Sequence, residues 1–74
     1  MPAILRPSGA LRDLVGGQAE IQVKAGLTVR ETLSTLGIVP ETVALVVVNE
    51  EQRTKDYVIQ DDDIIRVLAV IGGG

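Results

Sequence analysis

Residues 28–38 read TVRETLSTLGI, and this run predicts a helix with a defined start and a defined end. Thr28 followed by Glu31 has the spacing of a capping box, in which each side chain accepts a hydrogen bond from the other residue's backbone N–H. Gly37 suits the left-handed position just beyond a helix, and Ile38 after it can contact the last helical turn. Together these signals bound the main helix of the fold.

One side of this helix is apolar at positions i, i+4 and i+7, which are Val29, Leu33 and Leu36, so it should pack against a sheet. Four runs predict the strands of that sheet. Residues 20–24, EIQVK, alternate polar and apolar as in a half-buried strand. The other three are largely apolar, namely PAILR at residues 2–6, ALVVV at 44–48 and IIRVLAVI at 64–71. One main helix on a mixed sheet of four to five strands is an α+β arrangement.

A second, short helix is expected between the first two strands. Ser8 can cap its start, and Leu11, Leu14 and Val15 share one apolar face. The glycines at residues 16–17 then end it.

The last strand has two faces with different expected roles. Ile65, Val67 and Ile71 share one parity and are expected to face the helix, while the other parity points outward. We expect a patch that binds a partner protein, formed by Leu68, Val70, Val46 and Arg66. The residues equally allow the short first helix to cover this patch.

Polar residues separate the third strand from the last one. Residues 53–60 are expected to be mixed, with a short strand or turn around residues 57–59, and Asp61, Asp62 and Asp63 to form a solvated loop. A metal site is not expected there, because the side chains of consecutive residues diverge. Tyr57 is expected to be structural, with its ring packed and its hydroxyl bonded to the backbone. The lysines, at positions 24 and 55, are expected to be surface residues without a special role.

Composition excludes several classes of function. The chain has 74 residues, enough for one domain, and a formal charge of −3. Its basic residues are scattered and its only aromatic residue is Tyr57, so nucleic-acid binding is not expected. No Cys or His is present, which excludes thiol nucleophiles, disulfides and Cys or His metal sites. With no apolar run near the roughly 20 residues of a membrane span and no signal-peptide pattern, we expect a soluble cytoplasmic protein that binds no cofactor.

Three glycines, Gly72, Gly73 and Gly74, follow the last strand and close the sequence. Because glycine lacks Cβ, such a tail is flexible and can also lie extended in a narrow channel. When extended, it would carry the terminal carboxylate about 10 Å beyond the folded body. We therefore expect a domain over residues 1–71 and a tail over residues 72–74 that presents its carboxylate to another protein. A frayed end without function is the plain alternative.

Several motifs of the chain resemble the MoaD/ThiS family of ubiquitin-like sulfur carriers. Residues 10–17, ALRDLVGG, are similar to that family's first helix, and residues 26–33, GLTVRETL, to the opening of its main helix. VNE at residues 48–50, an acidic loop and IRVLAVIGGG at residues 65–74 resemble its closing half. Residues 53–60, RTKDYVIQ, also resemble a segment of ubiquitin at a similar distance from the end. The resemblance covers almost the whole chain and implies the ubiquitin-like β-grasp fold.

The resemblance also implies a function. The protein would be a cosubstrate and not an enzyme, although such a chain can count as the small subunit of a synthase. An E1-like enzyme would use ATP to adenylate the carboxylate of Gly74, and a sulfur donor would convert it to a thiocarboxylate. Gly72 and Gly73 would thread the channel of that enzyme. A downstream sulfur-accepting enzyme, or the large subunit of a synthase, would receive the sulfur in molybdopterin, thiamine or cysteine synthesis or in tRNA thiolation.

Two other functions stay open at this point. A ubiquitin-like modifier would use the same adenylation to join its C-terminal glycine to target lysines. A plain interaction module would have an inert tail. The residues also allow Gly73, in place of Gly74, to be the working terminus.

Overall fold

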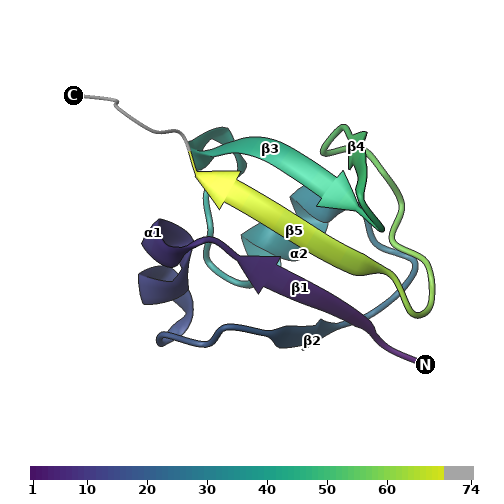
Figure 1. The fold of residues 1–74 in the computed structure, drawn as a ribbon, viewed down its shortest axis with the longest axis horizontal. Helices are drawn as coiled ribbons and strands as arrows, with labels where there is room; N and C mark the ends of the chain where they lie inside the picture. The colour runs from purple at the N-terminus through teal and green to yellow at the C-terminus, as the bar shows by residue number, and fades with distance from the viewer. Residues whose placement is uncertain (70–74) are drawn as a thin grey trace.

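The computed structural model describes residues 1–69, which form a five-stranded sheet and two α-helices (Figure 1). The strands are β1 (Ala3–Pro7), β2 (Ile21–Val23), β3 (Val43–Val48), β4 (Glu51–Arg53) and β5 (Ile64–Ala69). The helices are α1 (Gly9–Arg12) and α2 (Val29–Thr35), and two 3-10 turns are η1 (Asp13–Val15) and η2 (Pro40–Thr42). No helix in this described part of the chain has the length and apolar character needed to cross a membrane.

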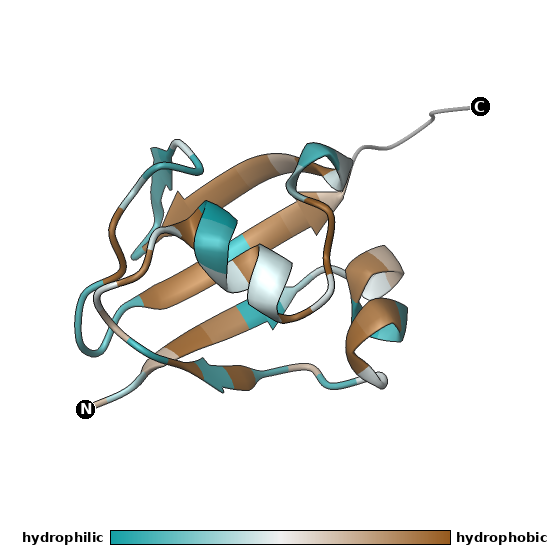
Figure 2. Ribbon diagram, turned by 180° about the vertical axis from the view of Figure 1, so that it is seen from behind, coloured by the Kyte–Doolittle hydropathy of each residue, from teal (hydrophilic) through white to brown (hydrophobic). Residues whose placement is uncertain are grey.

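The strand order in the sheet is β2-β1-β5-β3-β4. The two central strands, β1 and β5, are parallel, and the other neighbours are antiparallel. α2 lies across one face of the sheet, in front of it in Figure 2. The predicted α+β arrangement, a mixed sheet packed on one main helix, is therefore confirmed.

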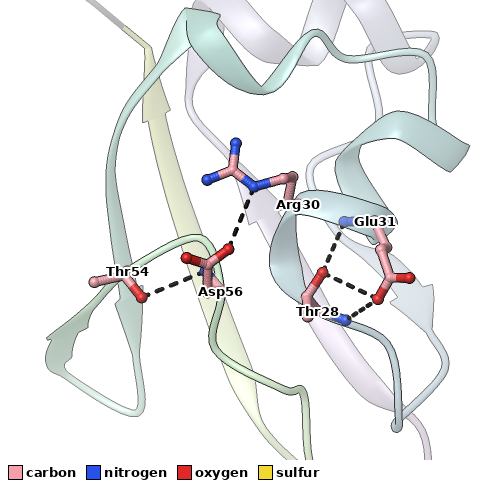
Figure 3. Close-up of polar contacts among 5 residues, drawn as sticks. All are labelled: Thr28, Arg30, Glu31, Thr54 and Asp56. Carbon is pink, nitrogen blue, oxygen red and sulfur yellow. Dashed lines mark hydrogen bonds and ion pairs between the residues drawn. The ribbon is translucent and has the colours of Figure 1, made fainter.

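Both ends of α2 have the predicted hydrogen bonds. The N–H of Thr28 donates to Glu31 Oε1 at 2.9 Å, and the N–H of Glu31 donates to Thr28 Oγ1 at 3.0 Å (Figure 3). The bonds from Thr28, that of its backbone foremost, hold the pKa of the Glu31 carboxyl below its ordinary value. At the other end Gly37 has a φ of 82°, and the N–H of Ile38 donates to the Leu33 carbonyl at 2.9 Å. This is a Schellman motif, as the Gly-Ile pair predicted.

The start of α2 also holds the segment that follows β4. The N–H groups of Val29 and Arg30 donate to the carbonyls of Tyr57 and Lys55 at 3.0 and 2.9 Å. The Arg30 guanidinium lies 3.4 Å from the Asp56 carboxylate (Figure 3). The irregular segment is thus fixed by backbone groups that a helix start leaves unpaired.

Aliphatic side chains build the core between the sheet and α2. The largest fully buried ones are Leu5, Leu33, Ile38, Ile59, Ile65, Val29, Val43, Val46 and Val67. Ile65 and Val67 have the inward parity predicted for β5, whereas Ile71 lies outside the described residues. β-Branched residues in the central strands suit this packing, because their side chains fill the pleated surface well.

The short first helix differs from its prediction. Leu11 is 2% exposed and lies in the core, but Leu14 is 54% exposed, so they do not share a buried face. α1 lies at one end of the sheet (Figure 1), and Val15 of η1 packs against the core together with Leu11. The Ser8 side chain does not cap the helix, and its Oγ accepts a hydrogen bond from the N–H of Ala69 at 3.3 Å.

β4 is a strand that the sequence does not predict. Its three residues, EQR, are all polar and exposed, so they carry no period-two signal. β4 pairs with β3 through a two-residue turn at Asn49 and Glu50, which have φ angles of 50° and 71°. Two positive φ angles are those of a type I′ hairpin turn.

Asp63 contradicts the prediction of a solvated acidic loop. Asp61 and Asp62 are exposed, but Asp63 is 5% exposed. The hydroxyl of Tyr57 donates to the Asp63 carboxylate at 2.7 Å, so the prediction that it bonds to the backbone is also wrong. Asn49 Nδ2 and the N–H of Gln60 donate to the same carboxylate at 2.7 and 2.8 Å. A buried carboxylate needs such donors, and here they come from two segments, the β3–β4 turn with Asn49 and the segment after β4 with Tyr57 and Gln60.

Candidate functional site: the outer sheet face and the end of β5

The end of β5 is fixed to the start of α1. The N–H of Ser8 donates to the Val67 carbonyl at 2.9 Å, and the Ala69 N–H returns a bond to the Ser8 hydroxyl. Five residues of the sequence follow Ala69. The predictions made for Val70, Gly72, Gly73 and Gly74, and the domain boundary at residue 71, fall outside the described residues. They remain predictions.

The face of the sheet opposite α2, called the outer face below, carries half-buried apolar side chains. They are Ile4 on β1, Leu45 and Val47 on β3, and Ile64 and Leu68 on β5. Leu45 lies opposite Leu68 in the β3–β5 pairing, and Val47 lies opposite Arg66. Leu68 and Arg66 therefore occupy the outward positions that their parity predicted.

The prediction that Val46 joins this patch is wrong. Val46 is 2% exposed and lies opposite Val67, whose side chain is also buried, in the β3–β5 pairing. Its neighbours Leu45 and Val47 face outward in its place. A strand of continuous apolar residues shows no alternation, and a register shift between Val43 and Leu45 interrupts the pairing, so parity could not be assigned from the sequence.

α1 lies beside the patch and does not bury it. Ser8 and Arg12 line the same hollow as Leu68, whose side chain stays half-buried. Leu68 is therefore only partly covered.

Arginine side chains gather on the outer face next to the apolar residues. Arg6 of β1 and Arg66 of β5 are direct partners in the parallel pairing, and both are exposed. Neighbouring strands lie about 4.8 Å apart, so the two side chains leave the sheet side by side. Arg6 Nε and Nη2 both lie 2.9 Å from Glu20 Oε2. Within residues 1–69, neither Arg66 nor Arg12 forms an ion pair.

Two hollows flank the Arg6–Arg66 pair. The larger has a volume of about 530 Å³ and extends from the pair towards α1, with Arg12, Glu20 and Leu68 among its lining residues. The smaller, of about 400 Å³, extends towards the β3–β4 turn and is lined in part by Ile64. The outer face is therefore a shallow concave surface with two guanidinium groups near its middle.

Sequence reasoning named Arg66 and Leu68 but missed five residues at this face, which are Ile4, Arg6, Arg12, Leu45 and Val47. A signal existed for Arg6, because it is the one charged residue in an otherwise apolar strand and so marks the outward parity of that strand. The sequence carries no signal that Arg12 lies near Leu68, because this proximity depends on how α1 packs beside the end of β5. The side chains of this face are mainly apolar or guanidinium groups, which can bind and orient a partner.

Comparison with known proteins gives matches over most of the chain. Residues 8–74 match the ThiS family. The sulfur carrier protein TtuB of Thermus thermophilus is 40% identical over 55 residues, which are 74% of this chain and 83% of that protein.

A solved structure matches the fold. The crystal structure of SAMP1 from Haloferax volcanii superposes with a TM-score of 0.70 and covers 100% of both chains, at 14% sequence identity. Together with the mixed sheet and its single main helix, this likeness identifies the fold as the ubiquitin-like β-grasp.

Proposed function

The chain belongs to the ThiS family and is a sulfur carrier, not an enzyme, and on that premise we propose that it carries sulfur as a thiocarboxylate on the carboxylate of Gly74. The observation that supports this most directly is the extent of the family match. It continues to residue 74 and so includes all three glycines of the tail. A match to the fold alone would not need to extend beyond β5.

The chemistry begins with a carboxylate that no sulfur nucleophile can attack directly, because its leaving group would be oxide. An E1-like partner supplies ATP, the carboxylate oxygen attacks the α-phosphorus, and pyrophosphate leaves. A donor at the oxidation level of sulfide then forms the C–S bond as the bond to AMP breaks and a proton is released. The product is a C-terminal thiocarboxylate, an anionic nucleophile that a downstream enzyme can use. Splitting one difficult substitution into two activated ones is the general advantage of a covalent intermediate.

The carrier's own part in this scheme is to present the terminus and to be recognised. Glycine residues without Cβ suit a narrow channel that leads to a nucleotide site. The outer face, through Leu68, Arg66, Leu45 and Val47, is the surface that the partner enzymes contact in this proposal. The end of β5 at Ala69, the last described residue before the tail, is held to α1 through Ser8.

The mass of the intact chain, purified from its native host, tests the proposal. Replacement of one oxygen by sulfur adds about 16 Da to the chain that ends at Gly74. Adducts with other proteins, cleaved back to a free carboxylate by an isopeptidase, would instead identify a protein modifier. A chain with only the free carboxylate, in cells that contain both the activating enzyme and its sulfur donor, would contradict both functions.

A further inference from the structure

We propose that Arg66 and Arg12 form a carboxylate-binding site for an acidic segment of the enzyme that activates the tail, and that Glu20 is a built-in occupant of the neighbouring position on Arg6. This inference rests on the proposed function for the identity of the partner. It adds the chemistry by which that partner is recognised.

Two like charges lie side by side on the outer face. Arg6 and Arg66 are direct partners across the parallel β1–β5 pairing. Like charges opposite one another in a sheet are unfavourable unless an anion lies between or beside them. The protein otherwise has an excess of acidic residues and a formal charge of −3. A local concentration of guanidinium groups on such a chain indicates an anionic ligand for that face.

One guanidinium of the pair, that of Arg6, already binds a carboxylate. Glu20, just before β2, places one carboxylate oxygen 2.9 Å from both Nε and Nη2 of Arg6. Both side chains are about half exposed, at 50% and 54%, so the pair is a surface interaction that a partner can replace. A carboxylate thus reaches this face from the segment before β2, and one of its oxygens lies within hydrogen-bond distance of two guanidinium nitrogens.

The other arginines, Arg66 and Arg12, lie near the end of β5. Arg66 and Arg12 line the hollow of about 530 Å³ together with Leu68 and the Ser8 region that holds the end of β5. An acidic side chain placed there would lie beside an apolar one, the mixture typical of a docking surface with a charged rim. Any enzyme that engages the residues following Ala69 must approach this same end of the sheet.

The carboxylate of a protein side chain, and not a nucleotide phosphate, is the ligand we assign to this site. The structure's own occupant is a carboxylate, and among residues 1–69 no glycine-rich loop surrounds this open hollow as a phosphate site would require.

Steady-state adenylation by the E1-like enzyme of the host, followed as pyrophosphate release, separates docking from chemistry. For Arg66→Glu and Arg12→Glu we expect KM for the carrier to rise about tenfold or more, while kcat stays within about twofold, because the terminus and its chemistry are unchanged. Glu20→Gln frees Arg6 and should lower KM. Lys24→Glu is the matched control, since it changes the charge equally, is exposed and lies outside both hollows of the outer face.

Direct titration of the enzyme with each carrier, at low and at raised salt, completes the test. The wild-type affinity should fall with salt, and that of Arg66→Glu should fall less. Equal effects of Arg66→Glu and Lys24→Glu would overturn the inference, because only bulk charge would then matter. Wild-type adenylation with unchanged KM in Arg66→Glu would overturn it while leaving the proposed function intact. Absence of adenylation would count against the proposed function. The titration would still decide whether Arg66 and Arg12 contribute to binding of the enzyme.

Discussion

The carboxylate of Asp63 and the hydroxyl of Tyr57 lie 2.7 Å apart and join the start of β5 to the segment that follows β4. Asn49 and the N–H of Gln60 donate to the same carboxylate. Burial raises the pKa of the Asp63 carboxyl, but the bonds from Tyr57, Gln60 and Asn49 together outweigh it and hold that pKa below its usual range. The bond to Asp63 in turn raises the pKa of the Tyr57 hydroxyl.

Acid should weaken the protein through Asp63. Because its folded-state pKa is lowered, the group contributes stability above its unfolded pKa of about 3.9 and loses it as pH falls through the folded value. Urea unfolding at pH 7 and at pH 3 measures this loss. Asp63→Asn should cost about 1–3 kcal/mol at pH 7, since its amide N–H₂ would meet donors, and should show a smaller loss in acid. Asp62→Asn, at an exposed position, is the control, and an equal effect from it would contradict the assignment.

The β3–β4 turn should become more stable with glycine at its second position. Glu50 has a φ of 71°, a conformation that costs an L-residue about 1–2 kcal/mol. Glu50→Gly removes this cost against an entropic penalty of about 0.5–1 kcal/mol, so the thermal midpoint should rise slightly. Glu51→Gly, on β4 where φ is negative, should lower it. A fall in both variants would show that the turn is not strained.

The core prediction concerns Leu33, which is 0% exposed on α2. Leu33→Ala should cost about 2–5 kcal/mol, because it removes buried methyl groups and leaves a cavity. Leu14→Ala deletes the same atoms at a position that is 54% exposed, so its effect should be within about 0.5 kcal/mol. Chemical denaturation of the two variants measures both values. Equal losses would mean that the Leu14 side chain is packed as tightly as that of Leu33.

The outer face should carry partner affinity through Leu68. Leu68→Asp should leave the circular dichroism spectrum intact, because the side chain is only half-buried, and should weaken binding to the activating enzyme about tenfold or more. Val39→Asp places the same charge at a residue that is 57% exposed on the loop after α2, and should bind normally. Wild-type affinity in a folded Leu68→Asp variant would place the partner surface elsewhere.

The tail prediction concerns Gly74. A Cβ at this position should clash with a channel shaped for glycine, and a deletion should withdraw the carboxylate by about 3.3–3.6 Å. A misplacement of about 1 Å can cost a reaction about 100-fold, so Gly74→Val and the deletion should abolish adenylation. The fold should be unaffected, because the described core residues lie between Ala3 and Val67. Normal adenylation of the deleted chain would make Gly73 the working terminus.

The sequence by itself determined the elements whose signals are local. The capping box of Thr28 and Glu31 and the Gly37-Ile38 end are contacts between near neighbours, so their spacing alone fixed α2. The parity of β5 could be read because Arg66 interrupts its apolar run. The resemblance of motifs to the ThiS family rested on the same order of local signals, which the family match then confirmed.

Only the tertiary structure decided features that depend on residues distant in the chain. Asp63 appeared solvated because its donors lie on other segments, and the parity of Val46 had no polar residue to mark it. Arg6 and Arg66 lie near opposite ends of the sequence, and the β1–β5 register alone places them side by side. Local spacing fixes backbone hydrogen bonds within an element, whereas burial and charge proximity are set by how the elements pack.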